Sequence, residues 1–114
     1  NGKEFLIGSN GKFSKNDFFK NQLPFIFGSP QIDEFLKFKY LVDKSRISYD
    51  EIKNLYFFPS KRWDLELKNN KLIRLSKNNL EESLELASNF LYNSEFKDIK
   101  TIDARVKNQI ILND

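Results

Sequence analysis

Apolar and charged residues alternate in one central segment of the chain, and this pattern predicts a β-hairpin. Trp63 and Leu65 alternate with charged residues on the first arm, and Ile73 and Leu75 do so on the second. A period of two is typical of strands that bury one face. A three-residue loop over 68–70 places Leu65 opposite Ile73 and Trp63 opposite Leu75, whereas a two-residue loop would place a charged residue opposite Leu65. We therefore predict the three-residue loop, in which Asn supplies the left-handed backbone.

A second alternating segment predicts another hairpin near the end of the chain. Apolar and polar residues alternate through 98–106, and a turn then leads into a short apolar strand. The same register argument pairs Ala104 with Leu112, and Val106 with the residue two positions before Leu112. Ile111 then lies on the other face, beside Arg105. The predicted final strand comprises Gln109, Ile110, Ile111 and Leu112.

Two segments have the i, i+3, i+4 spacing of amphipathic helices. The first follows the start signal Ser29–Pro30 and runs to about residue 44. The second is capped by Asn78 or Asn79, and its apolar stripe comprises Leu80, Leu84, Ala87 and Leu91. Between the two helices, a capping pattern at Ser48 and an aromatic-rich run before Pro59 predict a short turn and then a strand.

The N-terminal part of the chain predicts three short strands. Residues 4–7 and 12–15 flank a Gly-rich turn and form a hairpin, and 23–27 contains Pro24, which favours a strand start or an edge. The whole pattern predicts an α+β fold in which two helices pack on a mainly antiparallel sheet, with the C-terminal strand at the sheet edge. We expect one domain over residues 1–114.

Composition narrows the chemistry that this domain can perform. The chain has no Cys and no His, so it lacks the commonest general base and metal ligands, and we expect no metal site and no cofactor. Acid/base chemistry by paired carboxylates stays open on composition alone. The net charge is +3, and the Lys and Arg residues are interspersed with acidic residues instead of forming a basic stripe. The chain has no Met and starts Asn1-Gly2, so we interpret it as a fragment of a longer protein.

Several motifs in a fixed order resemble one bacterial family. The segment "KRWDLELKNNKLIRLS", a capped helix, and then "IKTIDARVKNQIIL" are similar to the end of the extracytoplasmic β domain of the FtsQ/DivIB cell-division proteins. The segment "FLIGSNGKF…LPFIFGSP" resembles the start of that domain. The resemblance extends over most of the chain and is weakest between Phe38 and Phe58. The chain lacks the small residues and the terminal Trp that some members have at the end.

The resemblance implies a non-enzymatic scaffold in the divisome. Members are single-pass inner-membrane proteins with a POTRA domain before the periplasmic β domain, and this β domain binds FtsB- and FtsL-like proteins. The FtsB-like partner adds a strand to the last strand. By motif, Arg105, Val106 and the strand Gln109–Leu112 would form that surface, and Arg62 beside Trp63 would supply a nearby salt bridge. The resemblance therefore implies a membrane anchor upstream and no small-molecule substrate.

The residues themselves leave two interpretations of the final strand open. A terminal strand without Lys or Pro, such as "QIIL", is either covered within its own fold or accepts a strand from another chain. In the central hairpin we expect Trp63 in the core, Asp64 facing water, and Arg62 exposed on the face opposite Trp63. The rival hypothesis is a basic single-stranded nucleic-acid-binding module that uses surface Phe and Tyr. A third, a small carbohydrate-acting enzyme, requires two carboxylates that face each other across a cleft.

Overall fold

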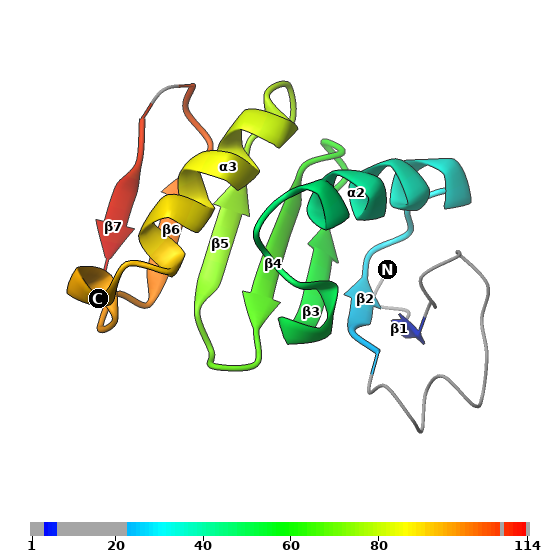
Figure 1. Cartoon of the computed structure of the whole chain (residues 1–114). Coiled ribbons are helices and arrows are strands. Elements are labelled where there is room, and N and C mark those ends of the chain that lie inside the picture. The colour runs from blue at the N-terminus through cyan, green and yellow to red at the C-terminus, as the bar shows by residue number, and fades with distance from the viewer. Residues whose placement is uncertain (1–3, 7–22, 108, 114) are drawn as a thin grey trace.

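The described part of the chain forms a seven-stranded sheet and two helices (Figure 1). The computed structural model describes residues 4–6, 23–107 and 109–113. The helices are α2 (Ile32–Lys44) and α3 (Leu80–Leu91), and two 3-10 turns are η1 (Tyr49–Glu51) and η2 (Ser94–Phe96). The strands are β1 (Glu4–Leu6), β2 (Phe25–Phe27), β3 (Ile52–Phe57), β4 (Trp63–Leu67), β5 (Leu72–Leu75), β6 (Thr101–Ala104) and β7 (Ile111–Asn113).

The order of the strands in the sheet follows their order in the chain, from β1 to β7. Four neighbouring pairs are antiparallel, and β2–β3 and β5–β6 are parallel. The α+β class is confirmed, but the sheet is mixed. The reason is that α2 and α3 each connect two adjacent strands, and a helical crossover returns the chain in its starting direction.

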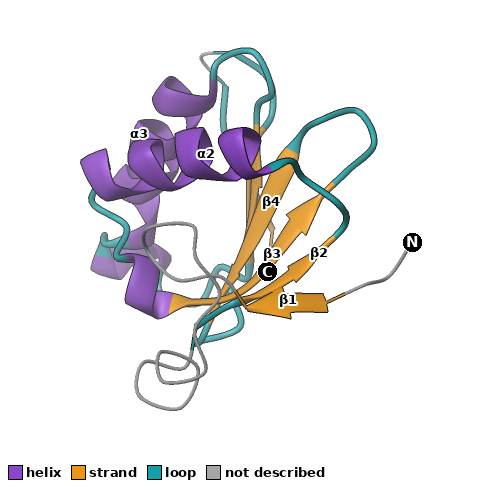
Figure 2. Ribbon diagram, turned by 90° about the vertical axis from the view of Figure 1, so that its right-hand side faces the viewer, coloured by secondary structure: helices purple, strands orange, loops and turns teal. Residues whose placement is uncertain are grey.

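Both helices lie on the same side of the sheet (Figure 2), and the hydrophobic core lies between the two layers. Each strand from β2 to β7 contributes one residue to a single apolar row across that face. Paired in register, from β2 to β7, these are Ile26, Leu55, Leu65, Ile73, Ile102 and Leu112. Side chains one position along each strand point to the opposite face, and neither α2 nor α3 covers that face (Figure 2). We call this opposite side the open face.

The central hairpin β4–β5 has the predicted register. Leu65 pairs with Ile73, and the Leu67 N–H donates to the Lys71 carbonyl at 2.9 Å, so residues 68–70 form the loop. Asn70 has φ 71°, the left-handed conformation that this loop requires. Trp63 is buried, as predicted, and its ring stacks on Phe38 of α2 with centroids 4.2 Å apart.

The first helix begins two residues after the predicted start signal. Its N-cap is Gln31, whose backbone N–H donates to the Glu34 carboxylate at 2.9 Å. Gly28, just before it, has φ 106°, and a Cβ there would lie 2.2 Å from the Phe57 carbonyl oxygen. Only Gly fits where the chain leaves β2 so close to β3.

The other predicted elements are found with small shifts. The turn and strand after Ser48 are η1 and β3, and the second helix is α3 with Asn79 at its N-cap. The strand predicted over 23–27 is β2, which starts directly after Pro24. Of the predicted N-terminal hairpin, β1 pairs with β2, while the arm over 12–15 lies outside the described residues. Within the described residues, no helix is long and apolar enough to span a bilayer.

Candidate functional site

Strand β7 lies at one end of the strand order and pairs only with β6 among the described strands. Its inner side chain, Leu112, is half-buried and packs against the core. Ile111 points to the open face and is 45% exposed. An edge strand presents unpaired backbone N–H and C=O groups, so β7 offers main-chain hydrogen bonds together with an apolar side chain.

The register of the β6–β7 hairpin differs from the predicted one. Leu112 pairs with Ile102, not with Ala104, and β7 begins at Ile111, so the predicted pairing of Val106 with Ile110 does not form. The shift equals two residues, so every side chain keeps its predicted face.

The Asp103 side chain explains where this ladder stops. Its Oδ1 accepts the Arg105 backbone N–H at 3.1 Å, which removes that donor from strand pairing and ends β6 at Ala104. The Gln109 N–H donates to the Val106 carbonyl at 3.1 Å, so this connection is a turn. Gln109 is exposed and Ile110 is half-buried, and both precede the strand instead of lying within it.

Arg105 forms a two-point ion pair with Asp103. Its Nε donates to Oδ1 at 2.9 Å and its Nη2 to Oδ2 at 2.7 Å. These hydrogen bonds lower the pKa of the Asp103 carboxyl and raise the pKa of the guanidinium. Arg105 therefore already has a carboxylate partner within its own chain. The guanidinium is exposed, however, and two of its five N–H donors are used in this pair. Val106 beside it is 54% exposed.

Arg62 lies on the open face, opposite in direction to Trp63, as predicted. Its salt bridge is internal: the guanidinium donates to the Asp64 carboxylate and lies over the Phe58 ring, 4.6 Å from the centroid. The Arg62 side chain is only 20% exposed, so the predicted face is confirmed but the predicted exposure is wrong.

A row of charged residues crosses the open face between Arg62 and Arg105. The register places Asp64 opposite Arg74, and Arg74 opposite Asp103, which in turn is opposite Ile111. We call the five residues Arg62, Asp64, Arg74, Asp103 and Arg105 the charged row. Its three guanidinium groups exceed its two carboxylates, so the row is positive when both carboxylates are ionised.

Asp64, in the charged row, is buried instead of facing water, because its neighbours on the open face cover it. Burial raises the pKa of its carboxyl above the ordinary value of 3.8, although Arg62, Arg74 and Arg105 act in the opposite direction. The Nε of Arg74 is buried and has no hydrogen-bond partner within the described residues. A buried donor that lacks an acceptor costs free energy in the folded state.

The other half of the open face is aromatic and polar. Phe27 stacks on Tyr56, with ring centroids 5.2 Å apart. Glu66 accepts hydrogen bonds from Asn54 Nδ2 at 2.8 Å and from the Tyr56 hydroxyl at 3.0 Å. The bond from Asn54 contributes most to lowering the pKa of Glu66. Asn54, Tyr56 and Glu66 thus satisfy one another's hydrogen-bonding groups, whereas in the charged row the Nε of Arg74 has no acceptor among the described residues.

The fold thus gathers most of the predicted site residues at one end of the sheet. Arg105, Val106, Gln109 and the start of β7 lie together, and Arg62 reaches the same face from the position just before β4, which is three strands away from β7. Asp64 and Arg74, which connect the two arginines, were not predicted as site residues. The signal for them was present, because pairing Leu65 with Ile73 also sets Asp64 opposite Arg74.

In the described part of the chain, no group of three or more acidic side chains is placed to hold a metal ion. Comparison of the sequence with models of known protein families found no match, and comparison with curated proteins found none either.

Proposed function

We propose that this chain is a non-enzymatic scaffold domain of the bacterial division machinery, similar to the FtsQ/DivIB β domain. In this proposal an FtsB- or FtsL-like protein adds a strand to β7. The domain would lie in the periplasm, with a membrane anchor upstream. The observation that carries the proposal is the position of β7: it is the last strand in the order, with Ile111 exposed on the open face.

The charged row gives the added strand a preferred chemistry. Strand addition draws affinity from main-chain hydrogen bonds and specificity from alternate side chains. A partner strand beside β7 would have every second side chain on the open face, next to Ile111 and near Arg105. An acidic side chain there would meet the exposed guanidinium of Arg105 while Asp103 holds that group in place.

The rival, a single-stranded nucleic-acid-binding module, would use the aromatic half of the open face. There, however, Tyr56 already stacks on Phe27, and the Phe58 ring is covered by Arg62. Asp64, Glu66 and Asp103 would also bring carboxylates near phosphates. A steep loss of affinity for random oligonucleotides with added salt would favour this rival over strand addition.

The carbohydrate-enzyme hypothesis has little support from the two carboxylates that line the cleft between α2 and the start of α3. That cleft is lined by Glu34 and Glu81, and each is engaged by a lysine, Lys61 and Lys44 respectively, at 3.0 Å. The hydrogen bond from the Gln31 backbone and then that from Lys61 lower the pKa of Glu34. A glycosidase needs a general acid that keeps its proton, which requires a raised pKa.

The test of the scaffold proposal is Ile111→Pro, with binding measured by isothermal titration against the FtsB- and FtsL-like proteins of the same organism. Pro removes one backbone donor and obstructs a neighbouring strand, so we expect binding to fall at least about tenfold while the melting temperature changes little. Ile111→Ala is the matched control, because it keeps the backbone donor. Equal affinity of the Pro variant and the unaltered chain would contradict strand addition at β7.

Charge reversal at Arg105 tests the side-chain part of the same proposal. Arg105→Glu should weaken binding, and an acidic-to-Lys change in the partner strand should restore part of it. Failure of every such pair to restore binding would leave the main-chain contact but remove the role proposed for Arg105.

A further inference from the structure

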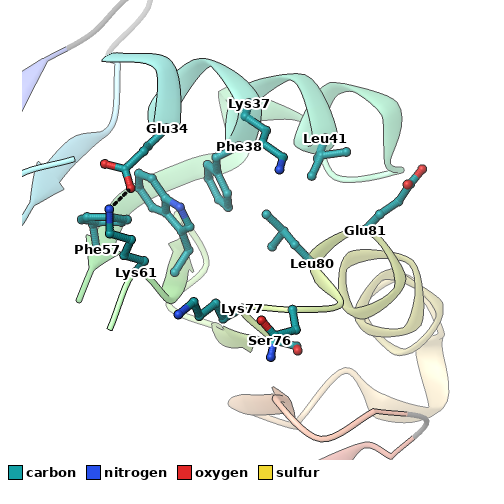
Figure 3. Close-up of a pocket in the computed structure, with 12 residues that line it drawn as sticks. Glu34, Lys37, Phe38, Leu41, Phe57, Lys61, Ser76, Lys77, Leu80 and Glu81 are labelled. Atoms are coloured by element: carbon teal, nitrogen blue, oxygen red, sulfur yellow. Dashed lines mark hydrogen bonds and ion pairs between the residues drawn. The ribbon is translucent and has the colours of Figure 1, made fainter. Parts of the chain in front are cut away.

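A groove opens on the helix side of the domain, away from β7. It lies between α2, the start of α3 and the loop after β3, and its volume is about 400 Å3 (Figure 3). Side chains from both helices and from the sheet point into it. The proposed strand addition takes place at the β7 edge, and no described residue of β6 or β7 lines this groove, so a strand bound to β7 would not cover it.

The floor of the groove is an aromatic cluster. Trp63 stacks on Phe38 with centroids 4.2 Å apart, and Phe57 contacts Trp63 at 4.7 Å. Leu41 of α2 and Leu80 of α3 add aliphatic surface on the walls. An apolar floor of this kind accommodates an aromatic or aliphatic side chain from a ligand.

The acidic residues on the rim are already neutralised. Glu34 accepts the Gln31 N–H at 2.9 Å and the Lys61 ammonium at 3.0 Å, as the dashed line in Figure 3 shows for Lys61. Glu81 is paired with Lys44, also at 3.0 Å. The rim therefore has little unbalanced negative charge.

Two lysines of the rim have no such partner. Lys37 extends from α2 and Lys77 from the segment after β5, and Figure 3 shows them on opposite sides of the groove. Both are exposed, and neither makes an ion pair or side-chain hydrogen bond with any described residue. Two unpaired ammonium groups thus flank the aromatic floor.

We propose that this groove is a docking site for a short acidic peptide segment of another protein that carries one aromatic side chain. The aromatic ring would pack on Trp63 and Phe57, and carboxylates on either side of it would pair with Lys37 and Lys77. Charge complementarity selects this occupant, because a basic or uncharged segment would leave both ammonium groups unpaired. This site is distinct from the β7 edge, so the domain would bind two partners at once.

The single Trp of the chain provides the test, because Trp63 lies in the floor of the groove. The probe is the peptide acetyl-Asp-Glu-Phe-Glu-Asp-amide, which contains no Trp, titrated into the full chain while Trp fluorescence is recorded. We expect a saturable change. Under the same conditions, Phe→Gly and all-Lys versions of the peptide should give no saturable change. An equal response to the all-Lys peptide would overturn the proposal.

Charge-reversal variants locate the binding site. Lys37→Glu combined with Lys77→Glu should raise the apparent Kd at least about tenfold, because two attractions become repulsions. Lys68→Glu combined with Lys100→Glu changes the net charge by the same amount, but at exposed positions away from the groove. This control should leave the Kd within about twofold. Circular dichroism checks that both variants are folded.

Equal weakening by both pairs of substitutions would show only a net-charge effect and would overturn the docking site. The outcome is separable from that of the scaffold proposal, since the groove variants should bind an FtsB-like strand normally and Ile111→Pro should bind the probe peptide normally.

Discussion

The central hairpin β4–β5 and the terminal hairpin β6–β7 are built from the same alternating pattern but have different surroundings. Strand β4 has β3 on its other side and β5 has β6, and the inner side chains Trp63, Leu65 and Ile73 are buried beneath the helices. Strand β7 has one neighbour, and its Ile111 remains 45% exposed. Alternation decides which face is buried, while neighbours on both sides decide how firmly each pairing is held. The terminal hairpin therefore retains an edge with unused main-chain hydrogen-bonding groups, whereas both strands of the central hairpin are paired on both sides.

The largest expected difference between the hairpins is in stability. Trp63→Ala removes a ring that stacks on Phe38 and contacts Phe57, so we expect a loss of about 3–5 kcal/mol in the free energy of unfolding. Ile111→Ala, the comparison in β7, should cost less than about 0.5 kcal/mol because the side chain is exposed. Urea unfolding of both variants measures this contrast. Similar losses would mean that the terminal hairpin contributes as much to the core as the central one.

A smaller effect is expected at the central turn. Asn70 has φ 71°, and an Ala there should destabilise the fold by about 1 kcal/mol, whereas Gly should be close to neutral. No described residue of the β6–β7 connection has a positive φ, so Gly substitutions there should give no such benefit over Ala. Thermal unfolding of the Asn70→Ala and Asn70→Gly variants provides the measurement. If Ala were tolerated as well as Gly, the turn would not depend on left-handed geometry.

The smallest effect distinguishes two neighbouring carboxylates by pH. The folded-state pKa of Asp64 is raised above 3.8 by burial, so this group stabilises the fold at low pH and loses that contribution as pH rises through its folded pKa. The pKa of Asp103 is lowered below 3.8, so its contribution is present above that pH and is lost as pH falls. The slopes of stability against pH should therefore change in opposite senses in Asp64→Asn and Asp103→Asn. Denaturant unfolding from pH 2.5 to about 6 measures them, and slopes that change in the same sense would contradict this assignment.

Much of the central region could be predicted because local and tertiary preferences agree there. Trp63, Leu65 and Ile73 can share one face only with a three-residue loop, and Asn70 can adopt the backbone that this loop needs. The burial of Asp64 was missed for a tertiary reason. Its position on the open face follows from alternation, but its cover comes from Arg62 and from the strands on either side, β3 and β5, and alternation within β4 contains no information about how those side chains pack over it.

The terminal region could be predicted only in part. Alternation fixed the faces of Leu112 and Ile111 correctly, but the pairing depends on where β6 stops. A side-chain hydrogen bond from the Arg105 N–H to Asp103 determines that point, and periodicity contains no information about it. The two parallel pairings were also missed, because they follow from helices that connect adjacent strands.

The agreement between strand order and chain order has a consequence for how the domain folds. Each described strand pairs with the strand that precedes it in the chain, so no pairing waits for a distant segment to arrive. Contacts between near neighbours in sequence cost less loop-closure entropy and favour rapid folding. A chain that emerges N-terminus first could therefore assemble its sheet strand by strand. At each stage of synthesis, the most recently added strand would then be the unpaired edge of the sheet. Among the described strands, the last of these is β7.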